Sequence, residues 1–189
     1  MSALTTFLWL GFMVNLAHAE GYDVQDKLAF EQQAEALSGK FAADLKKTLM
    51  AAVQSGGLSA GVQVCHSEAA KIAQSYSSNG WEIGRTSLKT RNHRNQPNAE
   101  QLHILQSFAD KLAQGADISS LSQVSYNEDD KRYLYMKPIA TQALCLACHG
   151  DNIEPQLHSK IKALYPQDTA TGFKLGDMRG AFTVTYQAQ

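Results

Sequence analysis

The sequence has little of what would assign it to a specialised class of protein. Its 189 residues include only four prolines and three cysteines, and its 17 basic and 18 acidic side chains leave a formal net charge of -1. This balance argues against nucleic acid as the main partner, because phosphate binding requires a basic surplus. No run of about 18 apolar residues is present, so no stable membrane span is expected. The hydrophobic fraction of 44% and charged fraction of 19% indicate a globular chain.

The first nineteen residues contain no Lys, Arg, Asp or Glu. An apolar run from Phe7 to Val14 precedes Ala17-His18-Ala19, which fits the small-x-small pattern that signal peptidase cleaves. We therefore predict a signal peptide at residues 1–19, cleavage after Ala19, and export of residues 20–189 to the periplasm as one domain. The alternatives are a buried N-terminal helix or an uncleaved anchor, although the apolar run is too short to span a bilayer.

Two of the three cysteines belong to one short motif. Cys145-Leu146-Ala147-Cys148-His149 matches C-x-x-C-H, the pattern at which c-type haem is attached. The spacing lets each thiol add to one vinyl group of the same haem, and it places His149 to coordinate the iron. We therefore predict one covalent haem c, held by Cys145 and Cys148 and ligated by His149.

Two other readings of this motif are less favourable. A thioredoxin-like redox pair requires a strand–helix–strand context, and a following His is not part of it. A zinc site could use three Cys and one His, but Cys148 and His149 are sequence neighbours and would strain to occupy two corners of one tetrahedron.

Haem attachment leaves Cys65 unpaired, so this thiol is either an apolar core residue or the second axial ligand of the iron. It falls on the apolar face of a helix expected over residues 59–76. His66 is an alternative ligand, but it points about 100° away on the same helix. Met136 and Met178 are further alternatives, since Met/His is a common axial pair in cytochromes c.

Arg85, Arg91 and Arg179 are candidates to bind the haem propionates, because a guanidinium matches a planar carboxylate. The alternative for each is a solvated charge or a structural ion pair. Asp168 is expected to shape a turn rather than to perform chemistry.

Hydrophobic periodicity predicts an α+β fold with an antiparallel sheet. Gly56-Gly57 should end a long first helix, and Asn98 with Gln101 should form a capping box. Helices are expected at residues 22–53, 59–76, 98–114, 155–164 and around the haem motif, and strands at residues 81–87, 121–127, 132–139 and 180–186. No internal repeat or linker divides the chain.

Four groups of residues, in order, carry a resemblance to a known family. They are Val62-Gln63-Val64-Cys65; Arg85-Thr86-Ser87-Leu88-Lys89-Thr90-Arg91-Asn92 with Asn95-Gln96-Pro97; Cys145-Leu146-Ala147-Cys148-His149-Gly150; and Tyr165-Pro166-Gln167-Asp168-Thr169-Ala170 with Gly176-Asp177-Met178-Arg179-Gly180. The chain resembles the small periplasmic c-type haem domain catalogued as a domain of unknown function. That domain occurs as a stand-alone c-type cytochrome and as the ectodomain of sensor kinases.

The resemblance implies a PAS-like antiparallel sheet with a long N-terminal helix and flanking helices. It also implies one covalent haem with Cys65 and His149 as its axial ligands. The expected function is that of a periplasmic c-type cytochrome, which transfers electrons or poises redox state with an unidentified partner protein.

The alternative is a haem-based sensor module that reports a redox change or a diatomic gas to a partner protein, which would require Cys65 to leave the iron. No enzymatic activity is expected, because a peroxidase would need an open distal site with a distal base or charge pair, and the sequence identifies neither.

Overall fold

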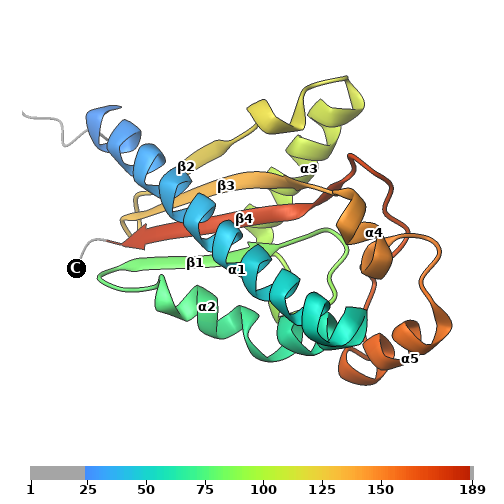
Figure 1. The fold of residues 1–189 in the computed structure, drawn as a ribbon. Helices are drawn as coiled ribbons and strands as arrows, with labels where there is room; N and C mark the ends of the chain where they lie inside the picture. The colour runs from blue at the N-terminus through green and yellow to red at the C-terminus, as the bar shows by residue number, and fades with distance from the viewer. Residues whose placement is uncertain (1–23, 188–189) are drawn as a thin grey trace, which may run out of the picture.

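A four-stranded antiparallel sheet forms the centre of the computed structural model, which describes residues 24–187 (Figure 1). The strands are β1 (Trp81–Thr86), β2 (Gln123–Asn127), β3 (Arg132–Ala140) and β4 (Met178–Gln187), and they pair in the order β1-β4-β3-β2. The last strand of the chain therefore lies between β1 and β3. The predicted α+β class is confirmed, whereas the predicted signal peptide lies outside the described residues.

The helices lie around this sheet, and Figure 1 shows the long helix α1 crossing it. They are α1 (Val24–Ser67), α2 (Ala69–Ser75), α3 (Ala99–Ala113), α4 (Ala143–His149) and α5 (Pro155–Leu164), with short 3₁₀ helices η1 (His93–Asn95) and η2 (Ile118–Ser120). None of the described helices combines the length and apolarity needed to cross a bilayer.

Alternate residues of β3 pack against different helices. Tyr135 is fully buried in a cluster with Phe30, Phe41 and other apolar residues of α1. Its neighbours Leu134 and Met136 belong to a second cluster with Ile104, Leu105 and Phe108 of α3. Because successive side chains of a strand point to opposite faces, α1 and α3 cover the two faces of the sheet.

Two glycines interrupt α1, as the sequence predicts. Gly56 and Gly57 have non-helical backbone angles, and Gly57 adopts φ 69° and ψ -172°, a conformation available almost only to glycine. The break separates the part of α1 that packs on the sheet from a second part, residues 58–67, that carries Cys65.

The expectation of one helix over residues 59–76 is wrong in detail. α1 ends before Glu68 and α2 begins after it. Glu68 itself keeps helical backbone angles, and its N–H donates to the Val64 carbonyl at 2.8 Å. The Ser67 hydroxyl donates to the Gln63 carbonyl at 3.1 Å, and such bonds back to the preceding turn bend helices.

A third apolar cluster joins the second part of α1 to α5 at one end of the sheet. Val62 packs there with Leu157, Ile161 and Tyr165, and Cys148 of α4 borders the cluster. The Glu154 carboxylate caps α5 by accepting hydrogen bonds from the N–H groups of residues 156 and 157. This cluster brings α4 beside the helical segment that carries Cys65.

The conformation of Gly57 generates a stability prediction. Gly57→Ala should lower the free energy of unfolding by about 1–3 kcal/mol, because a Cβ is strained at these angles. Gly39→Ala is the matched control: a Cβ at this helical position meets no atom within 4 Å, and the change should stabilise the protein by about 0.5–1 kcal/mol. Urea unfolding of both variants measures the difference. Equal stabilities would contradict the assigned strain at Gly57.

Candidate functional site

The three residues of the C-x-x-C-H motif lie on α4, as predicted. Cys145 and Cys148 are half-buried and one helical turn apart, so their thiols lie on the same side of the helix. His149 is the last residue of α4. The helix ends at Gly150, where a Cβ would lie 2.7 Å from the Leu146 carbonyl oxygen. Glycine therefore permits the close turn that follows His149.

A hydrogen bond sets the orientation of the His149 ring. Its Nδ1 lies 2.7 Å from the Ala170 carbonyl oxygen. Because a carbonyl can only accept, Nδ1 carries the proton and the Nε2 lone pair remains available for a metal. Phe173 contacts the ring edge-on with centroids 6.3 Å apart, and its N–H donates to the His149 carbonyl at 3.0 Å.

His149 is held in its neutral form. Burial lowers its pKa to about 2, and the positive charges of Arg179 and Arg91 act in the same direction. A neutral imidazole with a free Nε2 is the form in which histidine binds metals. The fold thus prepares His149 as a ligand before any metal binds.

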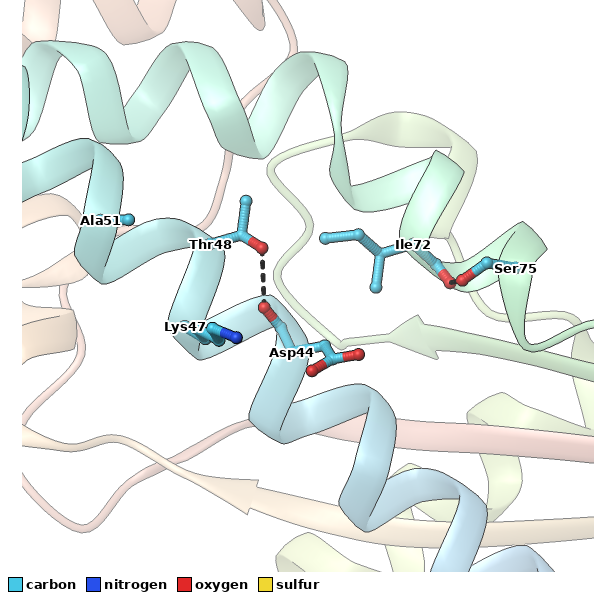
Figure 2. A pocket seen from close by; sticks show the side chains of 6 residues that line it. All are labelled: Asp44, Lys47, Thr48, Ala51, Ile72 and Ser75. Carbon is cyan, nitrogen blue, oxygen red and sulfur yellow. Dashed lines mark hydrogen bonds between the residues drawn. The ribbon is translucent and has the colours of Figure 1, made fainter.

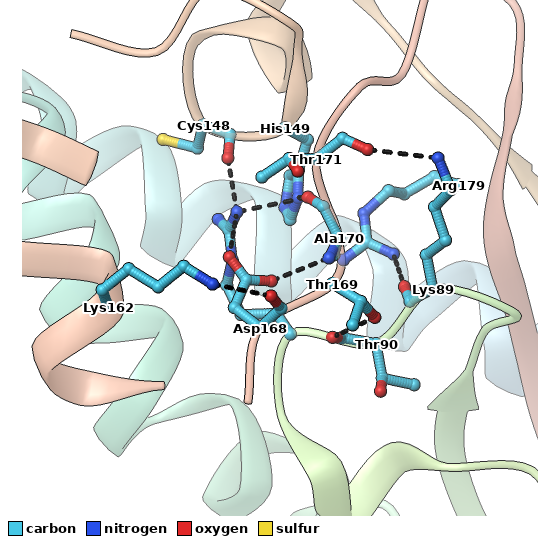
Figure 3. A network of polar contacts seen from close by, with 11 residues as sticks. Lys89, Thr90, Cys148, His149, Lys162, Asp168, Thr169, Ala170, Thr171 and Arg179 are labelled. Carbon is cyan, nitrogen blue, oxygen red and sulfur yellow. Dashed lines mark hydrogen bonds and ion pairs between the residues drawn. The ribbon is translucent and has the colours of Figure 1, made fainter. Parts of the chain in front are cut away.

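Arg91 and Asp168 form a buried ion pair next to this histidine. Figure 3 shows Asp168, Ala170 and Cys148 near His149. The charged atoms are 3.1 Å apart, and the side chains are 10% and 0% exposed. Arg91 also donates hydrogen bonds to the carbonyls of Cys148 and Ala170. The Asp168 carboxylate accepts a hydrogen bond from the Ala170 N–H at 2.8 Å. Arg91 therefore forms a structural ion pair, which is the alternative to propionate binding that the sequence leaves open.

Arg85 and Arg179 reach the same region from neighbouring strands. Arg85 lies on β1 over the Phe41 ring, with its guanidinium carbon 5.9 Å from the ring centre. Arg179 lies on β4, 5.1 Å from the centre of Phe173. Its Nη1 donates to Ser87 and to the Lys89 carbonyl, whereas its Nε is buried without a hydrogen-bond partner within residues 24–187.

These arginines leave the site with excess positive charge. Burial lowers the pKa of Arg85, and burial together with repulsion from Arg91 and Arg85 lowers the pKa of Arg179 to about 10. Neither forms an ion pair in the described part of the chain, whereas Arg91 is paired with Asp168. A buried, uncompensated guanidinium is unfavourable unless an anionic ligand approaches it.

Cys65 shares this electrostatic environment. Burial raises the pKa of its thiol, and Arg85, Arg91 and Arg179 partly offset that effect. Val62, on the same part of α1 as Cys65, packs in the apolar cluster that Cys148 borders, so this part of α1 lies close to α4. The five predicted site residues other than Cys145 and Cys148 therefore lie in one region of the structure. They are Cys65, Arg85, Arg91, His149 and Arg179.

A model of the family described as Tll0287-like matches residues 20–186. The chain belongs to the Tll0287-like family. The crystal structure of the cyanobacterial haem protein Tll0287 is similar to it, with a TM-score of 0.60 and 27% sequence identity, over 82% of this chain and 95% of that one. No curated protein matches at a significant level. The expected membership in a family of small haem-protein domains is confirmed.

In this Tll0287-like domain the alternative ligands occupy different surroundings. His66 is exposed and packs edge-on against Tyr165, with centroids 5.1 Å apart. Met136 is fully buried between the sheet and α3, and Met178 packs against the same cluster. Within residues 24–187 no three His, Cys, Asp or Glu side chains form a metal-binding group. A haem iron requires only two ligands from the protein.

Of two hollows on the described surface, only the second borders the candidate site. One of about 460 Å³ lies between α1 and α2, lined by Asp44, Lys47, Thr48, Ala51, Ile72 and Ser75 (Figure 2). Its Thr48 hydroxyl donates within the helix, to the Asp44 carbonyl at 2.8 Å. The other, of about 630 Å³, lies beside α3 and has Phe173 in its wall. Neither is lined by Cys65, Cys148 or His149.

Two members of the site are missed by reasoning from the sequence. Ala170 acts through its backbone carbonyl, which leaves no signature in the sequence. Phe173 contacts His149 from a loop, where periodicity gives no information. Asp168 could have been suspected as a partner for a basic residue, because it is a lone acid within the largely uncharged segment from Tyr165 to Ala170.

The low pKa of His149 predicts an acid-sensitive fold in the chain without haem. Its pKa is about 2 in the folded chain against 6.5 in an unfolded one, so the unfolded state takes up a proton first as the pH falls. The stability that His149 contributes is full above pH 6.5 and decreases below it. Lowering the pH from about 6.5 to about 5 should cost roughly 2 kcal/mol.

Urea unfolding at these two pH values, on protein produced without the haem-attachment machinery, measures the effect. His149→Gln is the control, because glutamine does not titrate and can still donate to the Ala170 carbonyl. The variant should lose this part of the pH dependence. The same slope in both proteins would show that another group causes it.

Proposed function

We propose that this chain is an exported c-type cytochrome that binds one covalent haem and serves one-electron transfer. The observation that carries the proposal is the state of His149, which is neutral, bonded at Nδ1 to Ala170, and free at Nε2 beside two thiols. Bound haem would supply an iron that alternates between the ferric and ferrous states. The similarity to a solved haem protein supports the same reading.

Cys145 and Cys148 would hold the haem covalently. Both thiols are half-buried, so they border the apolar interior and yet remain accessible to an incoming group. Cys148 packs at the edge of the apolar cluster formed by Val62 and residues of α5. These apolar side chains would contact the hydrophobic face of a porphyrin and exclude water from it.

His149 and Cys65 would be the two axial ligands. His149 requires no rearrangement, since the Ala170 carbonyl already orients its ring. Cys65 would be supplied by the second part of α1, on which Val62 packs against α5. A thiolate donates negative charge to the iron and favours the ferric state, so the reduction potential should be below that of a Met/His cytochrome. The nearby arginine charges oppose this effect.

Arg85 and Arg179 would bind the two propionates. Asp168 already neutralises Arg91, which leaves two unpaired guanidinium groups for the two carboxylates of one haem. The buried Nε of Arg179 supports the assignment, because it has no acceptor among the described residues and could donate to a propionate oxygen.

Periplasmic localisation follows from the same proposal. The family match begins at residue 20, immediately after the predicted cleavage point at Ala19. This boundary supports removal of residues 1–19 as a signal peptide. The partner protein would be a redox protein that approaches the haem from solvent.

A sensing role is the second candidate, and one feature of α1 favours it. Cys65 lies on the second part of α1, which Gly56-Gly57 separate from the part that packs on the sheet. The glycines provide a hinge at which this second part could turn and withdraw Cys65 from the iron. A carrier would retain Cys65 on the iron in both oxidation states, whereas a sensor would release it and signal to a partner protein.

Covalent attachment should depend on both motif cysteines. Cys145→Ser and Cys148→Ser should each lose or weaken haem retention on a denaturing gel stained for haem peroxidase activity, because each thiol forms one of the two thioether bonds. Co-expression with the haem-attachment machinery is required. The intact mass of the unaltered protein should correspond to a chain starting at Glu20 plus one haem. An unstained band of normal abundance would rule out the proposal.

Replacing Cys65 should change the spectrum and the reduction potential of the iron, whereas the haem should remain attached. Cys65→Ala should abolish the sulfur-to-iron charge-transfer absorption, and should raise the potential by on the order of 0.1 V, within the range of ~0.8 V that axial ligands span. Met178→Leu is the matched control and should leave spectrum and potential unchanged. If the Cys65 variant keeps the parental spectrum and the Met178 variant does not, the sixth ligand is Met178.

A further inference from the structure

We propose that Arg91 and Asp168 are a positioning pair for His149, and that their balanced charges set the reduction potential of the iron. The inference rests on the proposed function, because it concerns the ligand of a bound haem. It separates Arg91 from Arg85 and Arg179, with which the sequence groups it as a propionate partner.

One guanidinium holds His149 from two directions. Arg91 Nη2 donates to the carbonyl of Cys148, the residue before His149, and to the carbonyl of Ala170 at 3.3 Å. The Ala170 carbonyl is also the acceptor for His149 Nδ1. The backbone before the histidine and the acceptor of its ring are therefore hydrogen-bonded to the same side chain, that of Arg91.

Asp168 accepts hydrogen bonds from both Arg91 and the backbone of Ala170. One carboxylate oxygen accepts from Arg91 Nε at 3.2 Å, and the other accepts from the Ala170 N–H at 2.8 Å. Thr169 donates from its N–H and its hydroxyl to the Thr90 carbonyl, at 2.9 and 3.1 Å. The peptide that carries the Ala170 carbonyl is held at its other end, where the Thr171 N–H donates to the Thr169 carbonyl at 3.0 Å. Together these bonds keep the Ala170 carbonyl directed at His149.

Arg91 shares the Ala170 carbonyl with His149, and this has an electronic consequence. A hydrogen bond from Nδ1 increases the electron donation of the imidazole to a metal. A guanidinium on the same oxygen competes for its electron density and weakens that effect. Asp168 counteracts the guanidinium by neutralising its charge. The pair thus controls both the geometry and the donor strength of His149.

Burial makes the charge balance effective at the iron. The side chains of Arg91 and Asp168 are 10% and 0% exposed, so solvent screens them weakly. In general, two unit charges about 10 Å apart, at an effective dielectric constant of about 20, change an equilibrium constant by roughly tenfold. Leaving either charge without its partner should therefore be visible in the potential.

The test uses haem-loaded protein and two single substitutions of opposite sign. Asp168→Asn leaves a positive charge that favours ferrous iron, so the potential should rise. Arg91→Gln leaves a negative charge that favours ferric iron, so the potential should fall. Each change should be about tenfold in the ferric-to-ferrous ratio at fixed ambient potential, about 59 mV for one electron. Arg132→Gln, which breaks the pairs of Arg132 with Glu100 and Asp130, is the control and should cause no shift.

A merely structural role would loosen the site in both variants and move the two potentials in the same direction. Shifts of the same sign, or no shift, overturn the proposal. Both variants are required, because a loosened site alone could produce one of the two predicted signs. If either fails to accumulate with haem, Arg91→Lys decides: it keeps the charge, but it lacks the Nε donor to Asp168 and ends one bond short of Nη2, which reaches both carbonyls. Its ferric spectrum should show weakened histidine ligation, and an unchanged spectrum overturns the proposal.

Haem staining of the same samples separates this inference from the proposed function. If the unaltered protein binds no haem, the proposed function fails and the positioning role fails with it. If the unaltered protein and the variants bind haem and the potentials do not move as described, only the positioning role fails.

Discussion

The buried ion pair of Arg91 and Asp168 joins the parts of the chain that form the candidate site. Arg91 follows β1, Asp168 follows α5, and the two residues are 77 positions apart in the sequence. Their contacts extend to Cys148 at the end of α4 and to Ala170, whose carbonyl orients His149. The pair thus joins three loops at the end of the sheet, and the bonds of Thr169 to Thr90 and of Phe173 to His149 add to this connection. A buried ion pair costs desolvation of both charges, and the added hydrogen bonds to backbone offset that cost here.

The buried positive charges of the site would be more stable with an anionic ligand bound than in the polypeptide alone. Arg85, Arg91 and Arg179 act on the same histidine, and Asp168 is the carboxylate that pairs with one of them. Two positive charges in a partly desolvated region oppose each other, as the lowered pKa of Arg179 shows. A ligand with two carboxylates would remove this repulsion. In the proposed cytochrome, haem binding would therefore contribute to the stability of the fold as well as to its chemistry.

The interruption of α1 gives the long helix two separate tasks. Its first part packs Phe30, Ala34, Phe41 and Leu45 on the sheet. Its second part carries Cys65 and packs Val62 against α5, in the cluster that Cys148 borders. A straight helix could not follow both surfaces, so the glycines at residues 56 and 57 are what allow one helix to support the sheet and to supply a residue of the site. The same break would let Cys65 move if the iron released it.

The features that depend mainly on neighbouring residues could be predicted from the sequence alone. These are the C-x-x-C-H motif on a short helix, the break at Gly56-Gly57, the capping box of Asn98 and Gln101, and the four strands of the sheet. The helix boundary at Glu68 was not predicted. It follows Ser67, whose hydroxyl bonds back to its own helix, and such a serine differs little in sequence from one that faces solvent. Only the tertiary structure decided that Arg91 pairs with Asp168 and that the Ala170 carbonyl orients His149. Such contacts have no periodicity to reveal them, since they form only when β4 enters the sheet between β1 and β3 and brings distant loops together.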